Sequence, residues 1–153
     1  IWQEVEYVRS YLTIQKMRYK DKLEFEINVD PRITHAQIIR LVLQPIVENA
    51  IYHGLKYKES KGMLKVHGYE LGERIIIDIT DDGVGMDEET LKHIYDKHKV
   101  NYHSNGVGVY NVQQRLVLYY GKEYGIIYHS EKGKGTTATV VIPKKQEDVH
   151  EKI

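Results

Sequence analysis

The sequence predicts an α+β fold, a two-layer sandwich in which helices cover one face of a mixed, mostly antiparallel sheet. Two observations carry this prediction. Strand-like runs come in adjacent pairs joined by short turns, as in antiparallel hairpins. Segments with helical spacing lie between these pairs and do not follow every strand. A doubly wound parallel fold, which alternates strand and helix, therefore fits poorly.

A helix and then a strand are expected at the start of the chain. Residues 1–20 carry apolar side chains at steps of three and four with charges between them, which predicts an amphipathic helix. Residues 23–29 alternate between apolar and polar side chains. This alternation predicts a strand whose apolar face is formed by Leu23, Phe25, Ile27 and Val29.

A second helix is expected over residues 34–53. Thr34 followed by Gln37 has the form of a capping box, and a wide apolar stripe at helical spacing continues from it. Pro45 lies inside this stripe and has no N–H to donate to the carbonyl of Leu41. We therefore expect a kink or a local opening of the helix near Pro45.

The second half of the chain is predicted to contain two hairpins, separated by a long loop and a helix. The expected elements are strands 63–69 and 74–80, a short helix 88–95, a helix 107–120, and strands 125–130 and 136–142. The segment 81–108 around the short helix is glycine-rich and polar. Loops of this length are usually lids, binding loops or disordered segments.

Composition excludes several classes of function. The 153 residues suit one compact domain, and 41% apolar residues are enough to build a core. The absence of cysteine excludes disulfides, cysteine-bound zinc and thiol nucleophiles. Lys and Arg total 22 against 22 Asp and Glu, so no overall field steers a polyanion, and we expect no nucleic-acid partner.

The sequence also predicts where the protein resides. No window approaches the roughly 18 consecutive apolar residues of a membrane span, and the N-terminus lacks the features of a signal peptide. The chain starts at Ile1 within a helical pattern and without an initiator Met. We expect a piece of a longer polypeptide that makes no membrane contact itself and resides in the cytoplasm.

Four local features could hold chemistry. Asn49 and His53 share one face of the second expected helix. A DxGxG run, residues 81–85, follows a strand, and a GxG run, residues 106–108, opens a helix, where free amides can bind phosphate. A GxGT run, residues 133–136, precedes the last strand. Taken singly, each is as well explained by a solvated helix edge, a turn or a hairpin loop.

The order and spacing of these features resemble the GHKL ATPase superfamily, whose ATP site is called the Bergerat fold. More narrowly, residues 43–55 read LQPIVENAIYHGL and resemble the N-box of LytS/YesM-type bacterial sensor histidine kinases. The resemblance covers nearly the whole chain. The resemblance implies three parts of the chain: a leading helix at 1–20, an ATP-binding domain at 21–145 and a charged tail at 146–153. The leading helix would continue from a dimerisation and phosphoacceptor region that is absent from this chain.

The resemblance implies roles at the adenine and metal ends of an ATP site. Asp81 would accept a hydrogen bond from the adenine amino group, and Gly83 and Gly85 would let the purine lie against the backbone. Thr136 would support the adenine end through a water molecule. Asn49 would be the one protein ligand of Mg²⁺, which keeps several waters and bridges the phosphates.

The resemblance also implies roles at the phosphate end. The amides of the residues that open a helix would contact the phosphates, namely Gly106, Val107, Gly108 and Val109. Glu48 occupies the position of a catalytic base, but it could equally orient its neighbours. His53 would lie on the phosphate side, or would simply cap the last carbonyls of its helix.

The activity implied is that of the catalytic half of a sensor histidine kinase, with ATP and Mg²⁺ as cofactors. None of the eight histidines has the context of the phosphoacceptor in this family, so the acceptor would lie in another region of the full-length protein, in cis or in trans. The implied partners are that region and a downstream response regulator. The parent protein is expected to be a membrane-anchored homodimer.

Tyr52 stands where many relatives have a lysine that reaches the phosphates, and this difference keeps a nucleotide-sensing function open. Charge could come instead from Lys56, Lys97, Lys99 or Arg115, although Arg115 is more simply a surface residue. A nucleotide-sensing GHKL module that transfers no phosphate is one alternative. A GHKL ATP hydrolase of the gyrase or mismatch-repair type is another, and the serine-kinase branch that acts on anti-sigma partners fits the N-box less well.

Overall fold

The computed structural model describes residues 1–94 and 106–145. In this part of the chain one sheet has the strand order β1-β2-β3-β5-β4. The strands are β1 (Leu23–Val29), β2 (Gly62–Leu71), β3 (Arg74–Asp81), β4 (Gly125–Glu131) and β5 (Gly135–Pro143). Among the described strand pairs, only β1–β2 is parallel. The predicted mixed, mostly antiparallel sheet is confirmed.

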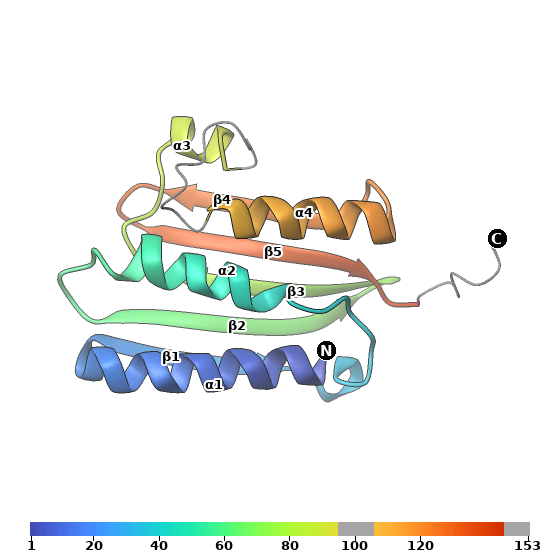
Figure 1. The fold of residues 1–153 in the computed structure, drawn as a ribbon, viewed down its shortest axis with the longest axis horizontal. Coiled ribbons are helices and arrows are strands. Elements are labelled where there is room, and N and C mark those ends of the chain that lie inside the picture. The colour runs from blue at the N-terminus through green and yellow to red at the C-terminus, as the bar shows by residue number, and fades with distance from the viewer. Residues whose placement is uncertain (95–105, 146–153) are drawn as a thin grey trace.

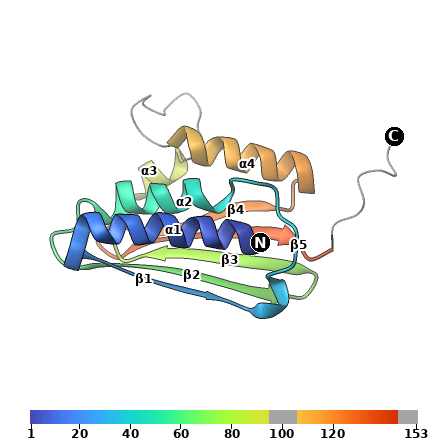
Figure 2. The same cartoon turned by 60° about the horizontal axis from the view of Figure 1, so that its bottom comes forward.

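The helices gather on one face of this sheet (Figures 1 and 2). They are α1 (Trp2–Tyr19), α2 (Leu43–Asn49) and α4 (Gly106–Tyr120), with a short α3 (Glu88–Lys92) between β3 and α4. A π-helical turn, η3 (Ala50–Leu55), continues α2, and 3-10 turns η1 (Lys20–Lys22) and η2 (Pro31–Ile33) flank β1. The two-layer α+β architecture is therefore as predicted.

The hydrophobic core lies between the helices and the inner face of the sheet. Each long helix contributes side chains that are almost fully buried, including Val5, Val8 and Leu12 of α1, Leu43, Ile46 and Val47 of α2, and Val109, Val112 and Leu116 of α4. Burial of each such side chain contributes about 1.5–3 kcal/mol. Because α1 shares this core, it is held against the rest of the domain; the division of the chain at residue 20 stays a prediction.

The second helix differs from the prediction. The expected capping box at Thr34 does not form, because the Thr34 hydroxyl donates to the carbonyl of Pro31 at 2.8 Å. Leu41 has a φ of 58°, in the left-handed region, which no helix passes through. The helix begins at Leu43, so Pro45 lies in its first turn, where an N–H has no helical partner to lose and no kink is needed.

A contact from another helix determines this start. Glu4 of α1 is buried, and its carboxylate accepts hydrogen bonds from the N–H groups of Leu41, Val42 and Leu43 at 2.7, 2.9 and 3.1 Å. These are the donors left free at the N-terminus of α2. A carboxylate there also interacts favourably with the helix dipole. Glu4 therefore caps α2 from a position 37 to 39 residues away in sequence.

The other elements lie within a few residues of their predicted bounds. Helix α3 begins at Glu88, as predicted, and ends at Lys92, before the expected residue 95. Residues 95–105, with Lys97 and Lys99, and the expected charged tail, 146–153, lie outside the described residues. In the described ranges, no helix is both long and apolar enough to cross a bilayer.

Candidate functional site

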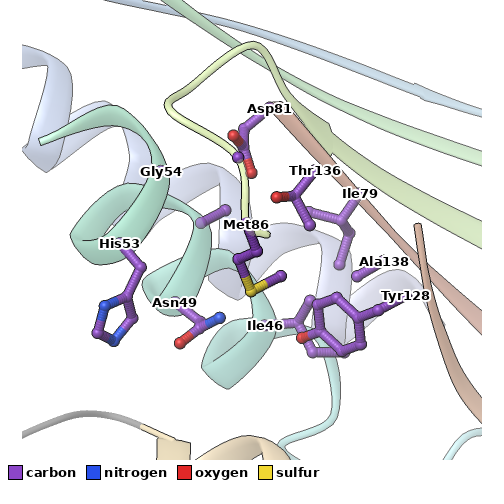
Figure 3. A pocket seen from close by; sticks show the side chains of 12 residues that line it. Ile46, Asn49, His53, Gly54, Ile79, Asp81, Met86, Tyr128, Thr136 and Ala138 are labelled. Atoms are coloured by element: carbon purple, nitrogen blue, oxygen red, sulfur yellow. The ribbon is translucent and has the colours of Figure 1, made fainter. Parts of the chain in front are cut away.

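A cavity opens between the end of the α2–η3 helix and the ends of β3, β4 and β5 (Figure 3). The space inside it is about 370 Å³ when the solvent at its open side is included. It is lined by Ile46, Asn49, Ala50, His53, Gly54, Ile79, Asp81, Gly85, Met86, Tyr128, Thr136 and Ala138. Most of the wall is therefore apolar, with a few polar groups that could orient a ligand.

Asp81 is the buried charge of this cavity. It is the last residue of β3, and only 3% of its surface is exposed. Burial raises the pKa of its carboxyl from 3.8 to about 6, and the charge of Asp82 adds to this, while N–H groups of Gly83 and Thr136 act in the opposite direction. The Gly83 N–H donates to Asp81 Oδ1 at 2.9 Å. At neutral pH the carboxyl is ionised and retains lone pairs for a donor.

The glycines of the DxGxG run are required by contacts within the protein. A Cβ on Gly83 would lie 2.3 Å from the carbonyl oxygen of Gly54. Gly85 has a φ of +66°, and a Cβ there would lie 2.0 Å from the carbonyl oxygen of Glu131. Gly85 lines the cavity, whereas Gly83 holds the carboxylate of Asp81. These glycines were expected to leave room for a purine. The close backbone contacts within the protein are a second reason why a side chain cannot be placed there.

Asn49 and His53 reach the cavity from the helix. Both are half-buried, and they share its cavity face with Ile46 and Ala50 at positions i, i+3, i+4 and i+7. Burial lowers the pKa of His53, and the nearby charge of Lys56 lowers it further. The imidazole is therefore neutral at pH 7. Figure 3 shows these two side chains on the helix, with Asp81 and Thr136 together at the other end of the cavity.

Of the residues predicted for the phosphate end, Glu48 and Gly108 lie outside the described wall of the cavity. Glu48 is half-buried, accepts a hydrogen bond from Gln44 Nε2 at 2.9 Å and helps to raise the pKa of Tyr11; it does not line the cavity. Gly108 lies against Pro45, since a Cβ built on it would be 3.4 Å from Pro45 Cβ. The GxG run therefore adjoins the first turn of α2.

The remaining candidates have clear positions. Val109 is buried in the core, and Gly106 and Val107 begin α4. Arg115 donates to the carbonyls of Arg40 and Leu41, so its role is to hold the segment before α2.

The position of the expected lysine is also outside the cavity. Tyr52 is exposed, and the ammonium of Lys56 lies 4.4 Å from the centre of its ring. In the described residues no group of three or more His, Asp or Glu side chains gathers to hold a metal ion. A metal at this site would need oxygen ligands from a bound molecule.

Comparison with known proteins identifies the family. A family profile described as "Histidine kinase-, DNA gyrase B-, and HSP90-like ATPase" matches residues 34–146, which is most of the chain. The chain belongs to this ATPase family. It is 32% identical to sensor histidine kinase YesM of Bacillus subtilis over 97% of this chain and 24% of YesM. It is 31% identical to sensor protein LytS of Bacillus cereus over 94% of this chain and 24% of LytS.

Solved structures show the same fold. The nucleotide-free catalytic domain of histidine kinase ThkA superposes with a TM-score of 0.67 at 14% identity, over 93% of this chain and 94% of that one. The histidine kinase domain of a blue-light-activated kinase from Erythrobacter litoralis gives 0.60 at 18% identity, over 91% and 60%. The chain spans about a quarter of the length of YesM and of LytS.

The apolar wall of this histidine kinase-type ATPase domain was not predicted. Ile46 and Ala50 lie one helical step from Asn49, and helical spacing could have found them. Ile79 and Ala138 lie two residues from Asp81 and Thr136, on the same face of their strands. Figure 3 shows the Met86 sulfur and the Tyr128 ring completing the wall, and no sequence pattern placed these two residues there.

Proposed function

We propose that this chain is the ATP-binding catalytic domain of a sensor histidine kinase, which presents the γ-phosphate of ATP to a histidine outside the chain. One observation carries the proposal: the buried carboxylate of Asp81 lies in a cavity whose other end holds Asn49 and His53. A buried charge needs a donor, and the amino group of adenine supplies one. The triphosphate then extends toward the helix.

The residues fit ATP and Mg²⁺ by their chemistry. The amide oxygen of Asn49 is a hard, neutral ligand, and Mg²⁺ commonly takes one or two protein oxygens with phosphates and waters as the rest. The hydroxyl of Thr136 supports the adenine end. Gly83 and Gly85 hold the loop against Asp81 and leave the cavity open to the base. The amides that open α4, from Gly106 to Val109, would bind the phosphates.

Phosphoryl transfer needs little more from this domain than positioning and charge stabilisation. A nitrogen of the acceptor imidazole forms a bond to the γ-phosphorus as the bond to the β–γ bridging oxygen breaks, and ADP leaves. We assign Glu48 as the base that accepts the proton of the incoming imidazole, and Gln44 orients the Glu48 carboxylate through a hydrogen bond. His53, neutral at pH 7, can donate one hydrogen bond on the phosphate side without adding charge.

The acceptor histidine, in this proposal, belongs to the same full-length protein and is supplied in cis or in trans. A response regulator then takes the phosphoryl group. The parent protein is a membrane-anchored homodimer with this domain in the cytoplasm. The balanced charge of the chain favours a local site for one small anion over an extended basic surface for a polyanion. In this proposal nucleic acid is therefore not a partner.

The full-length protein tests the proposal. Incubation with γ-labelled ATP and Mg²⁺ should leave acid-labile, base-stable label on the protein, as phosphohistidine does, and Asp81→Asn should abolish it. Tyr52 favours the nucleotide-sensing alternative, since its exposed ring brings no cation to the phosphates. ATP binding without label would support that alternative. Continuous phosphate release by the isolated domain would indicate an ATP hydrolase.

A further inference from the structure

Ser130 of β4 joins three segments at the adenine end of the cavity. Its hydroxyl donates to the carbonyl of Gly135 at 3.0 Å and accepts from the N–H of Met86 at 2.8 Å. It also lies 2.7 Å from the hydroxyl oxygen of Thr136. Ser130 itself does not line the cavity, whereas Met86 and Thr136 do. It therefore acts on the site through its neighbours.

The number of hydrogens determines the direction of the third bond. A serine hydroxyl has one hydrogen and two acceptor sites. A carbonyl can only accept, so the Ser130 hydrogen is used on Gly135, and the Met86 N–H occupies one acceptor site. In the contact with Thr136, Ser130 must then accept and Thr136 must donate. The single hydroxyl hydrogen of Thr136 is used in the bond to Ser130, so toward the cavity this hydroxyl can act only as an acceptor.

We propose that Ser130 is a positioning residue that orients the Thr136 hydroxyl as an acceptor beside Asp81, so that the polar end of the cavity selects an adenine over a 6-oxopurine. Asp81 and Thr136 are register partners in β3 and β5, and Figure 3 shows both at the same end of the cavity. The inference rests on the proposed function, because it assumes that the ligand is a purine nucleotide.

The chemistry of the two bases supports this selection. Adenine has an exocyclic amino group at C6 with two hydrogens, which two neighbouring acceptors can bind. Hypoxanthine has an oxygen at the same place, and it would face the Asp81 carboxylate and the lone pairs of Thr136. Sites built with specific hydrogen-bonding groups reject an analogue that leaves buried groups unpaired.

Other contacts hold this arrangement in place. The Gly133 N–H donates to the Val84 carbonyl at 2.7 Å, and a Cβ on Gly135 would lie 2.0 Å from the Asp81 carbonyl. The loop after β3 is thus fastened to the β4–β5 hairpin at several points. Ser130→Ala removes one of them and should leave the fold intact. It frees the Thr136 hydroxyl to rotate and donate.

The test compares the affinities of ATP and ITP, each with Mg²⁺, by calorimetry on this chain and its variants. The wild type should prefer ATP. Ser130→Ala should lower the ATP-to-ITP ratio about fivefold to tenfold, the effect of about one hydrogen bond. Thr137→Ala is the matched control, because Thr137 shares a hydroxyl pair of 3.0 Å with Thr80 but does not line the cavity. Its ratio should match the wild type.

A second variant covers the case in which Ser130→Ala does not fold. Thr136→Val removes the oriented hydroxyl but leaves Ser130 bound to Gly135 and Met86. It should lower the ratio to a similar extent, and adding Ser130→Ala to it should lower the ratio no further. An unchanged ratio in both single variants would overturn the inference. A wild type that binds neither nucleotide would instead overturn the proposed function.

Discussion

Glu4 and Asp81 are both buried carboxylates in the described residues, 5% and 3% exposed, yet they differ in what satisfies them. Glu4 accepts three backbone N–H groups at the start of α2 and does not line the cavity that contains Asp81. Asp81 lies in the wall of a cavity, and burial raises its pKa.

This difference separates a structural carboxylate from a binding one. Three backbone donors offset the cost of burying Glu4 within the protein itself. The N–H groups of Gly83 and Thr136 do not offset the burial of Asp81, because its pKa remains above the ordinary value. A ligand that donates to Asp81 would recover part of that cost. Burial alone therefore does not mark a site, whereas burial with incomplete internal pairing does.

The largest expected effect is the loss of nucleotide binding in Asp81→Asn. The new amide can still accept from the Gly83 N–H, but it presents an N–H₂ group where the adenine amino group would also donate. ATP affinity should fall about 100-fold, because a hydrogen bond to a charged group is lost and two donors then face each other. Calorimetric titration measures this. The melting temperature at pH 7 should not fall, because the cost of burying the charge is gone.

Asp82→Asn is the matched control for this variant. Asp82 is the adjacent carboxylate, but it is bound by the Met63 N–H at 2.8 Å and by Lys58 at 2.9 Å, and it does not line the cavity. ATP affinity within about twofold of the wild type is expected for this more exposed pair. Equal losses in the two variants would contradict the assignment of Asp81.

Glu4→Gln should give the opposite pattern. The neutral amide oxygen can accept at most two of the three N–H groups and no longer interacts as an ion with the helix dipole. The free energy of unfolding should fall by about 2 kcal/mol, which urea titration followed by circular dichroism measures. ATP affinity, corrected for the unfolded fraction, should be unchanged. If Glu4→Gln lost ATP affinity but kept the wild-type free energy of unfolding, Glu4 would contribute to binding and not only to the cap of α2.

Asn49→Ala separates the metal from the base. The gain in ATP affinity on adding Mg²⁺ should shrink by about tenfold, since one oxygen ligand is lost while waters and phosphates remain. Affinity measured in EDTA should match the wild type. Stability should change little, because Asn49 is only half-buried at the cavity edge. A full Mg²⁺ effect in this variant would exclude Asn49 as the ligand.

The smallest expected effect is that of pH. The Asp81 carboxyl has a pKa of about 6, so it binds an amino donor less well as it becomes protonated. Affinity should fall about fourfold between pH 7.5 and about pH 5.5. An Asp81→Asn titration over the same range corrects for the protonation of the nucleotide. A wild-type profile identical to that of the variant would rule out Asp81 as the titrating group.

The same group also affects stability with a definite sign. The folded-state pKa of Asp81 lies above its ordinary value of 3.8, so the folded protein binds this proton more tightly than the unfolded chain. Its contribution to stability is complete below about pH 4 and is lost as pH rises through about 6. The difference in unfolding free energy between wild type and Asp81→Asn should therefore change across this range.

Local patterns predicted most of the fold, and the failure of one helix shows their limit. The alternation of residues 23–29 and the apolar spacing of α1 are properties of contiguous segments, and both were confirmed. The capping box at Thr34 was wrong because the Thr34 hydroxyl donates to the Pro31 carbonyl and α2 begins only at Leu43. The donors at that later start are bound by Glu4, from another helix. No local rule includes a partner 38 residues away.

The candidate site was predicted in part for a similar reason. Asn49, His53, Asp81 and Thr136 were each marked by a motif, and the structure brings all four to one cavity. Ser130 carried no motif of its own, and its importance follows from three contacts that cross between segments.

The sequence by itself determined the strands, most helix bounds and the polar residues of the site, because each depends on neighbours within a few positions. Only the tertiary structure decided where α2 begins, which buried carboxylate is left for a ligand, and whether the Thr136 hydroxyl offers the cavity a donor or an acceptor. These features depend on hydrogen-bond partners that distant segments supply. The free energy of each such hydrogen bond is determined only when the segments pack together.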